Sequence, residues 1–90
     1  MTEQDTDIRR KQLRFRAWHR GTREADLLLG PFADFYLPAC APEGVEAFAR
    51  LLDVEDPDLW DWVVGKKPVA PEHETDTFSA LRRFVMEREP

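Results

Sequence analysis

Five consecutive residues near the start of the chain have types and a spacing that could recognise a polar surface. Residues 20–24 read Arg-Gly-Thr-Arg-Glu. Arg20 and Glu24 together would present a fork of hydrogen-bond donors and an acceptor, which suits directional polar contacts. Gly21 has no side chain, so the backbone of another protein could approach it closely. One interpretation of this segment is therefore a docking turn.

The same residues also have a purely structural interpretation. Gly21 can end one helix or cap the next, and Glu24 can reach back to a free amide at the helix start. Arg20 and Arg23 would then be solvated charges without a further role. Spacing alone favours this structural account, so a docking role needs support from the rest of the sequence.

A second polar segment, rich in acids, ends at Trp62. Asp56 can cap a helix, Pro57 presets its first turn, and Asp58 places negative charge where the helix dipole favours it. Trp60 and Trp62 would lie about 200° apart around a helix, so they cannot share one face. One of them is expected to be partly exposed, either as an interface anchor or as an ordinary surface tryptophan.

Residue sets typical of enzymes and metal sites are missing from the sequence. It contains no phosphate-binding loop, no Gly-x-Gly-x-x-Gly motif and no nucleophile elbow. Ser79 is the only serine and falls inside an expected helix without an obvious base. Cys40 is the only cysteine, and His19 and His73 lack the spacing of metal ligands. The chain is therefore expected to be neither an enzyme nor a metalloprotein.

Charge is distributed unevenly along the chain, although the net charge is only −5. Residues 8–23 hold seven basic side chains and no acid, whereas residues 43–61 hold seven acids against the single Arg50. A basic stripe can bind phosphate backbones, but here the acidic half would repel them. Docking onto another protein suits such a two-signed surface better, so no nucleic-acid partner is expected.

The composition also bears on where the protein works. No apolar run approaches the roughly 20 residues that a membrane-spanning helix needs, and the N-terminus lacks the apolar core of a signal peptide. A lone thiol is consistent with a reducing compartment. We therefore expect a cytoplasmic protein that is not inserted in a membrane and that is monomeric.

Apolar spacing and the positions of glycine and proline predict helices throughout and no strand. The expected fold class is all-α: a compact five-helix bundle that forms one domain over residues 1–90, with flexible ends at about 1–6 and 88–90. The helices are expected at about residues 6–18, from 22 to beyond 35, at 42–52, at 56–64 and at 75–88.

Two local features of these helices follow from the residue pattern. In the first helix, Ile8, Phe15 and Trp18 are expected to form the inner face, with smaller apolar residues at its margin. In the second, Gly30-Pro31 is expected either to kink the helix or to divide it into two short ones, because proline removes an amide donor.

The two polar segments together resemble the SdhE-type flavinylation-factor family, the bacterial relatives of the mitochondrial succinate dehydrogenase assembly factor. The hallmark of that family is an Arg-Gly-x-x-Glu motif, which Arg20, Gly21 and Glu24 match. The similarity covers roughly residues 8–65, with further matches at Leu27, Pro31-Phe32, Phe48, residues 50–52, residues 56–59 and Trp62. Gly30 before the proline departs mildly from the family pattern.

The resemblance implies a helical assembly factor that binds the flavoprotein subunit of succinate dehydrogenase and promotes covalent attachment of its FAD. Fumarate reductase flavoproteins would be a related client class. FAD would belong to the client, so this chain is expected to bind no cofactor stably. By the same resemblance, partner binding falls on the motif and on the start of the acidic segment, namely Arg20, Gly21, Glu24, Asp56, Pro57 and Asp58.

A rival interpretation is an antitoxin-like regulatory module, because relatives of this fold have been assigned that role. Such a module would use its basic face to engage a toxin or nucleic acid. It would have no special need for Gly21 and Glu24 together, and this difference separates the two hypotheses.

Overall fold

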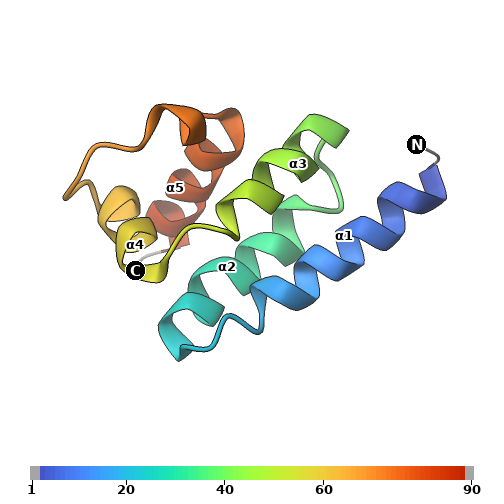
Figure 1. The fold of residues 1–90 in the computed structure, drawn as a ribbon, viewed down its shortest axis with the longest axis horizontal. Helices are drawn as coiled ribbons and strands as arrows, with labels where there is room; N and C mark the ends of the chain where they lie inside the picture. Colours follow the sequence, from blue (N-terminus) through green and yellow to red (C-terminus); the bar gives the residue numbers. More distant parts are fainter. Residues whose placement is uncertain (1–2, 89–90) are drawn as a thin grey trace.

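Five α-helices joined by short turns make up residues 3–88, the part of the chain that the computed structural model describes (Figure 1). They are α1 (Glu3–Ala17), α2 (Arg23–Tyr36), α3 (Pro42–Leu51), α4 (Asp56–Val64) and α5 (Asp76–Arg88), with a 3₁₀ turn at Pro71–His73. No strand occurs among these described residues, so the all-α, five-helix prediction is confirmed. The expected flexible ends fall partly on residues 1–2 and 89–90, which lie outside that range.

The packing of the helices explains how segments distant in sequence meet. α1 and α2 run side by side in opposite directions, and α3 packs against α1 and α5 (Figure 1). α4 packs against α5 at the end of the molecule farthest from the start of α1 (Figure 1). The turn between α1 and α2 therefore lies beside the connection from α3 to α4.

The core is built around the ring of Phe32 on α2. This ring stacks on Tyr36 with centroids 4.9 Å apart, and it contacts Phe48 of α3 at 6.0 Å and Phe84 of α5 at 5.6 Å. Aromatic pairs at such separations are favourable beyond the area that they bury. Around this ring pack further fully buried side chains from all five helices, among them Leu13, Leu28, Leu51, Leu59 and Leu81.

The prediction for the inner face of α1 is wrong. Leu13 and Ala17 are buried, with 1% and 0% of their surface exposed, whereas Ile8 and Phe15 are 50% and 64% exposed. Small Ala17 lets α1 approach α2 closely, and this orientation also turns the neighbouring arginines toward acceptors on α2 and α3. Leu13 and Ala17, which were placed at the margin of the apolar face, therefore form its buried centre.

Of the two alternatives for Gly30-Pro31, a kink or a division into two short helices, the division does not occur. α2 continues through Pro31, because the residues on both sides of the proline are held in the core: Leu29 and Phe32 are completely buried. Their burial outweighs the amide hydrogen bond that the proline cannot make.

Gly30 is needed for close packing against Trp18, which its position beside a proline did not indicate. The indole of Trp18, at the end of α1, lies directly on this glycine, and a methyl group at residue 30 would fall 2.3 Å from the ring. The indole nitrogen of Trp18 donates to Asp34 at 3.3 Å, which fixes the ring in that position. Any residue larger than glycine would displace it.

The Gly30→Ala variant is expected to be less stable than the parent by about 1–3 kcal/mol, the usual cost of overpacking a filled site. An alanine on an open helix surface would instead stabilise by about 1 kcal/mol, so the sign of the change is informative. Urea denaturation followed by circular dichroism measures it, with Ser79→Ala on the exposed surface of α5 as the control. A raised midpoint for Gly30→Ala would contradict the tight Trp18 contact.

Candidate functional site

The turn between α1 and α2 is held by its own polar groups. The Thr22 side chain caps α2 by accepting a hydrogen bond from the Ala25 amide at 3.2 Å. The Arg20 amide donates to the Asp26 carboxylate at 2.7 Å. The prediction that Glu24 bonds back to an amide of the turn is wrong: Asp26 makes such a bond, to an amide two residues before the N-cap.

Gly21 occupies a conformation that few other residues adopt. Its φ is 107°, in the region that L-amino acids with a side chain avoid. The prediction that Gly21 ends the first helix or caps the second is wrong, because α1 ends at Ala17 and Thr22 is the N-cap of α2. The glycine instead allows the turn between them. Nothing else in the described structure lies within 4 Å of where its side chain would be. A substitution here would therefore strain the turn and would also project a side chain into open space.

Arg20 points into the protein and not toward solvent. Its guanidinium donates to the carbonyls of Leu52 and Val54 at 2.6 and 2.5 Å, and to one oxygen of Asp56 at 2.7 and 3.0 Å. Only 10% of its side chain is exposed. The expectations that it presents a donor fork at the surface, or that it is a solvated charge, are both wrong, since the loop before α4 offers acceptors that match the planar fork.

The Asp56 carboxylate accepts hydrogen bonds in the same cluster around Arg20. One oxygen accepts from Arg20, and the other accepts from the Thr22 hydroxyl at 3.2 Å. The prediction that Asp56 caps α4 is therefore wrong: Glu55 is the N-cap residue, and no side chain bonds there. A carboxylate that bonds across to the neighbouring turn cannot also fold back onto its own helix. The result is that α2 and α4 begin side by side.

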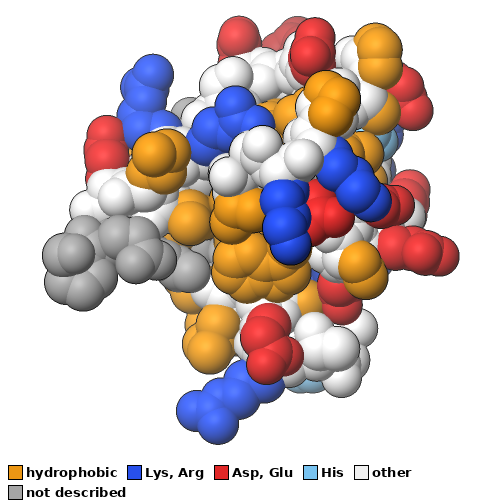
Figure 2. All heavy atoms as spheres, turned by 90° about the vertical axis from the view of Figure 1, so that its left-hand side faces the viewer, with side chains coloured by type: hydrophobic (Ala, Val, Ile, Leu, Met, Phe, Trp, Pro, Cys, Tyr) orange, Lys and Arg blue, Asp and Glu red, His pale blue; other side chains and the backbone are white. Residues whose placement is uncertain are grey.

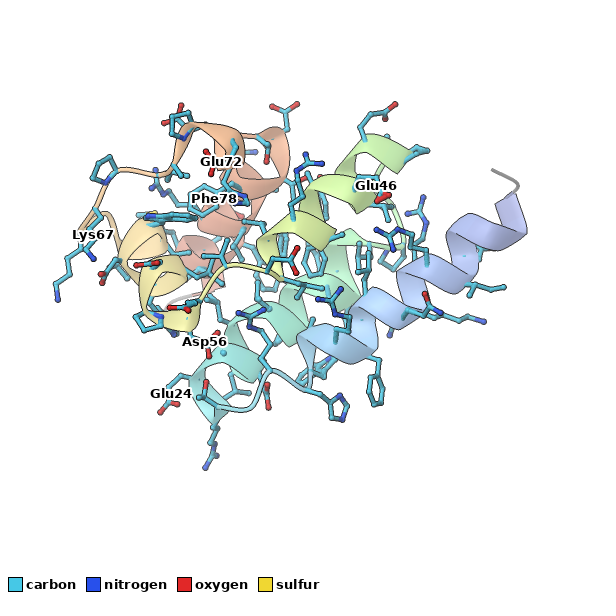
Figure 3. The ribbon with its side chains drawn as sticks, in the orientation of Figure 1. Glu24, Glu46, Asp56, Lys67, Glu72 and Phe78 are labelled. Atoms are coloured by element: carbon cyan, nitrogen blue, oxygen red, sulfur yellow. The ribbon has the colours of Figure 1, made fainter. Side chains whose placement is uncertain are left out.

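The α1–α2 turn and the start of α4 together form a junction. The remaining predicted site residues lie on its surface. Gly21, Glu24, Pro57 and Asp58 are all exposed. Glu24 lies in the first turn of α2, and no hydrogen bond or ion pair joins its carboxylate to any other described residue. Figure 3 shows Glu24 and Asp56 at the same end of the molecule, well apart from Glu72. The six predicted residues thus form one cluster, four facing outward and two inward.

Most of the arginines in the basic segment form ion pairs or hydrogen bonds with other parts of the fold. Arginines of the basic segment pair with acids of α2, of α3, of the link after α3 and of the start of α4. These pairs are Arg9–Glu46, Arg14–Asp34, Arg16–Asp53 and Arg20–Asp56. Arg10 donates to the carbonyls of Leu37 and Cys40. The two-signed layout was expected to serve docking onto another protein, and in the structure these pairs join the first helix to its neighbours.

An apolar surface that sequence reasoning missed lies between α4 and α5. A hollow between α4 and α5 is lined by Trp60, Val64 and Met86 among others, and the last two are 61% and 67% exposed. Figure 2 shows hydrophobic side chains gathered at the centre of this face, with charged ones around them. The tryptophan spacing predicted that Trp60 or Trp62 would be partly exposed, and both are half-buried. No comparable signal marked Val64 and Met86.

The residues that could hold a metal or act as nucleophiles have other partners. His19 stacks on Phe15 with ring centroids 4.0 Å apart, and His73 lies 5.5 Å from Trp62. Burial raises the pKa of the Cys40 thiol, and the Arg10 guanidinium only partly offsets it. Among the described residues, no three His, Cys, Asp or Glu side chains gather as a metal site would require. None of the described helices is long and apolar enough to cross a membrane.

Comparison with known proteins identifies the family. A family model described as flavinator of succinate dehydrogenase matches residues 11–85. The chain belongs to this family. The match includes the whole junction of α1, α2 and α4, so the resemblance seen in the sequence is confirmed.

Individual members of the flavinator family are similar over most of this chain. The FAD assembly factor SdhE of Acetobacter pasteurianus is 36% identical over 94% of the chain and 75% of its own length. Mitochondrial succinate dehydrogenase assembly factor 2 is 32% identical in Drosophila grimshawi and 38% identical in Komagataella phaffii, over 91% and 72% of the chain. The chain spans only 57% and 34% of those two mitochondrial relatives.

Removal of the Asp56 carboxylate should cost far more stability than removal of a surface acid. Asp56→Ala would leave Arg20 nearly buried without its counterion, for which a loss of about 3 kcal/mol is expected. Asp53→Ala breaks an exposed 3.4 Å pair with Arg16, and such pairs contribute about 0.5 kcal/mol. Thermal unfolding of both variants measures the difference. Equal losses would show that the Arg20 cluster is no more important than a surface pair.

Proposed function

We propose that this protein binds the flavoprotein subunit of succinate dehydrogenase and promotes the covalent attachment of FAD to it. Membership of the flavinator family supports the client and the reaction. The observation that carries the proposal is the Glu24 carboxylate, which is exposed and has no hydrogen-bond or ion-pair partner among the described residues, beside the open backbone of Gly21. A carboxylate on a rigid helix start, next to a surface without side chains, is suited to accept hydrogen bonds from a closely approaching partner.

In the proposed role this chain acts by holding the client in a productive geometry. The client supplies the nucleophilic histidine, and its FAD supplies the electrophilic methyl carbon. In the client, a bond between the histidine nitrogen and that carbon would form as a methyl C–H bond breaks. The C–H electron pair would reduce the flavin, which would take up the methyl proton and the imidazole N–H proton. Correct placement of two reacting groups alone can lower a barrier by on the order of 7–11 kcal/mol.

The outward residues of the junction would divide this work between them. Gly21 permits close contact, and Glu24 accepts hydrogen bonds from client donors. Pro57 and Asp58, exposed at the start of α4, would extend the contact along the same edge. FAD remains with the client in this proposal, and fumarate reductase flavoproteins would be clients of the same chemical kind.

The antitoxin-like alternative is the weaker hypothesis. It needs a free basic face, whereas the arginines at positions 9, 14, 16 and 20 are paired with acids of the same chain. It also gives no reason for an exposed Glu24 beside a glycine that leaves the surface open.

Two substitutions test the proposed docking surface, each with a matched control. Gly21→Arg and Glu24→Ala are expected to leave most client molecules without covalent flavin, because the first obstructs the contact and the second removes its acceptor. Gly65→Arg has the same kind of left-handed glycine with open space around it, at a φ of 84°, and Glu72→Ala removes another exposed carboxylate. Both controls should retain flavinylation.

The measurement is in-gel flavin fluorescence of the client in cells that lack their own factor. Circular dichroism of each purified variant confirms that it is folded. Wild-type fluorescence with Gly21→Arg and Glu24→Ala would refute the site. Equal loss with Gly65→Arg would mean that backbone strain, and not docking, explains the glycine.

A further inference from the structure

We infer that Arg20 and Asp56 act as a positioning pair: they hold the starts of α2 and α4 at a fixed separation, so that the outward residues form one docking surface. This inference rests on the proposed function and adds to it a division of labour within the predicted site. The resemblance placed both residues among the partner contacts, whereas their geometry gives them a different role.

The guanidinium of Arg20 links two segments that are distant in sequence, namely the turn between α1 and α2 and the segment from the end of α3 to the start of α4. Arg20 itself follows the end of α1, and its acceptors are spread along the link from α3 to α4, at Leu52, Val54 and Asp56. The side chain therefore fills the inside of that link and determines its curvature. Little of the fork remains for an outside acceptor, since Nε, Nη1 and Nη2 all donate within the chain.

Asp56 links the position of Arg20 to that of the docking residues. Its second oxygen accepts from the Thr22 hydroxyl at 3.2 Å, and Thr22 is also the cap of α2. A shift of Asp56 would therefore move the first turn of α2, which carries Glu24. On the other side, Asp56 is the first residue of α4 and directly precedes Pro57. The pair thus controls both halves of the exposed surface from beneath it.

The exposed fractions support this interpretation over direct contact. The Arg20 and Asp56 side chains are 10% and 25% exposed, against 38% and 45% for the otherwise similar pair of Arg9 and Glu46. Both pairs use two guanidinium nitrogens on one carboxylate, at closest distances of 2.7 and 2.8 Å. Arg9–Glu46 joins α1 to α3 away from the turn, so it serves as a control with equal chemistry and no docking role.

A double-mutant cycle distinguishes positioning from contact. The initial rate of client flavinylation is measured at saturating factor for Arg20→Lys, Asp56→Asn and the double variant, at a temperature where circular dichroism shows all of them folded. Lysine keeps the charge and loses the planar fork. Each single variant is expected to lose roughly ten- to a hundredfold in rate, the effect of a misplacement of about 1 Å. The double variant should be no slower than the worse single one.

The control cycle uses Arg9→Lys and Glu46→Gln, which should retain the wild-type rate. Losses that multiply in the Arg20–Asp56 double variant would mean that each residue contacts the client separately, which overturns the inference. Full activity of folded Arg20→Lys would overturn it as well, because the fork would then serve stability alone. An inactive wild-type protein would instead refute the proposed function itself, so the two failures are distinguishable.

Discussion

A guanidinium group withdrawn from water needs acceptors around its whole edge, and this requirement organises one end of the molecule. Arg20 finds its acceptors in the link between α3 and α4. To supply them, that link must curve around the side chain, and α4 must begin where Asp56 can face the turn. A charge left unpaired in this position would be far more costly than the pair is favourable. The cluster therefore selects one relative placement of the two helix starts.

The other ion pairs also fix the placement of helices, but each contributes less to the free energy of folding. They connect α1 to α2, to α3 and to the link after α3, but their side chains are 38–77% exposed, so each contributes little by itself. Their effect is on orientation, because they turn one side of α1 toward α2 and α3. The exposed apolar residues of α1, Ile8 and Phe15, are the consequence. A helix whose arginines face inward must leave some of its large apolar side chains outside.

The sequence was sufficient for the number and type of the helices, because their signals are local. Pro42 starts α3, Gly65 ends α4 in the left-handed conformation, and both follow from backbone chemistry alone. Helix faces and side-chain partners depend on neighbours distant in sequence, and there prediction failed. The capping assignment for Asp56 was reasonable for an isolated helix and wrong beside Arg20. Likewise, Gly30 reads as a helix breaker until Trp18 is placed against it.

The resemblance predicted which residues make up the site, but only the structure shows which of them face inward and which face outward. Residues of one motif divide between two physical tasks: Arg20 stabilises the turn from within, while Glu24 has no bond inside the described chain. Glu24 does gain a small stabilisation from the dipole of α2, but an aspartate or glutamate anywhere in that first turn would gain the same. Its particular place beside Gly21 brings no further advantage to the isolated fold. A feature that the fold does not need, on a turn that the fold holds rigid, is what the proposed docking surface requires.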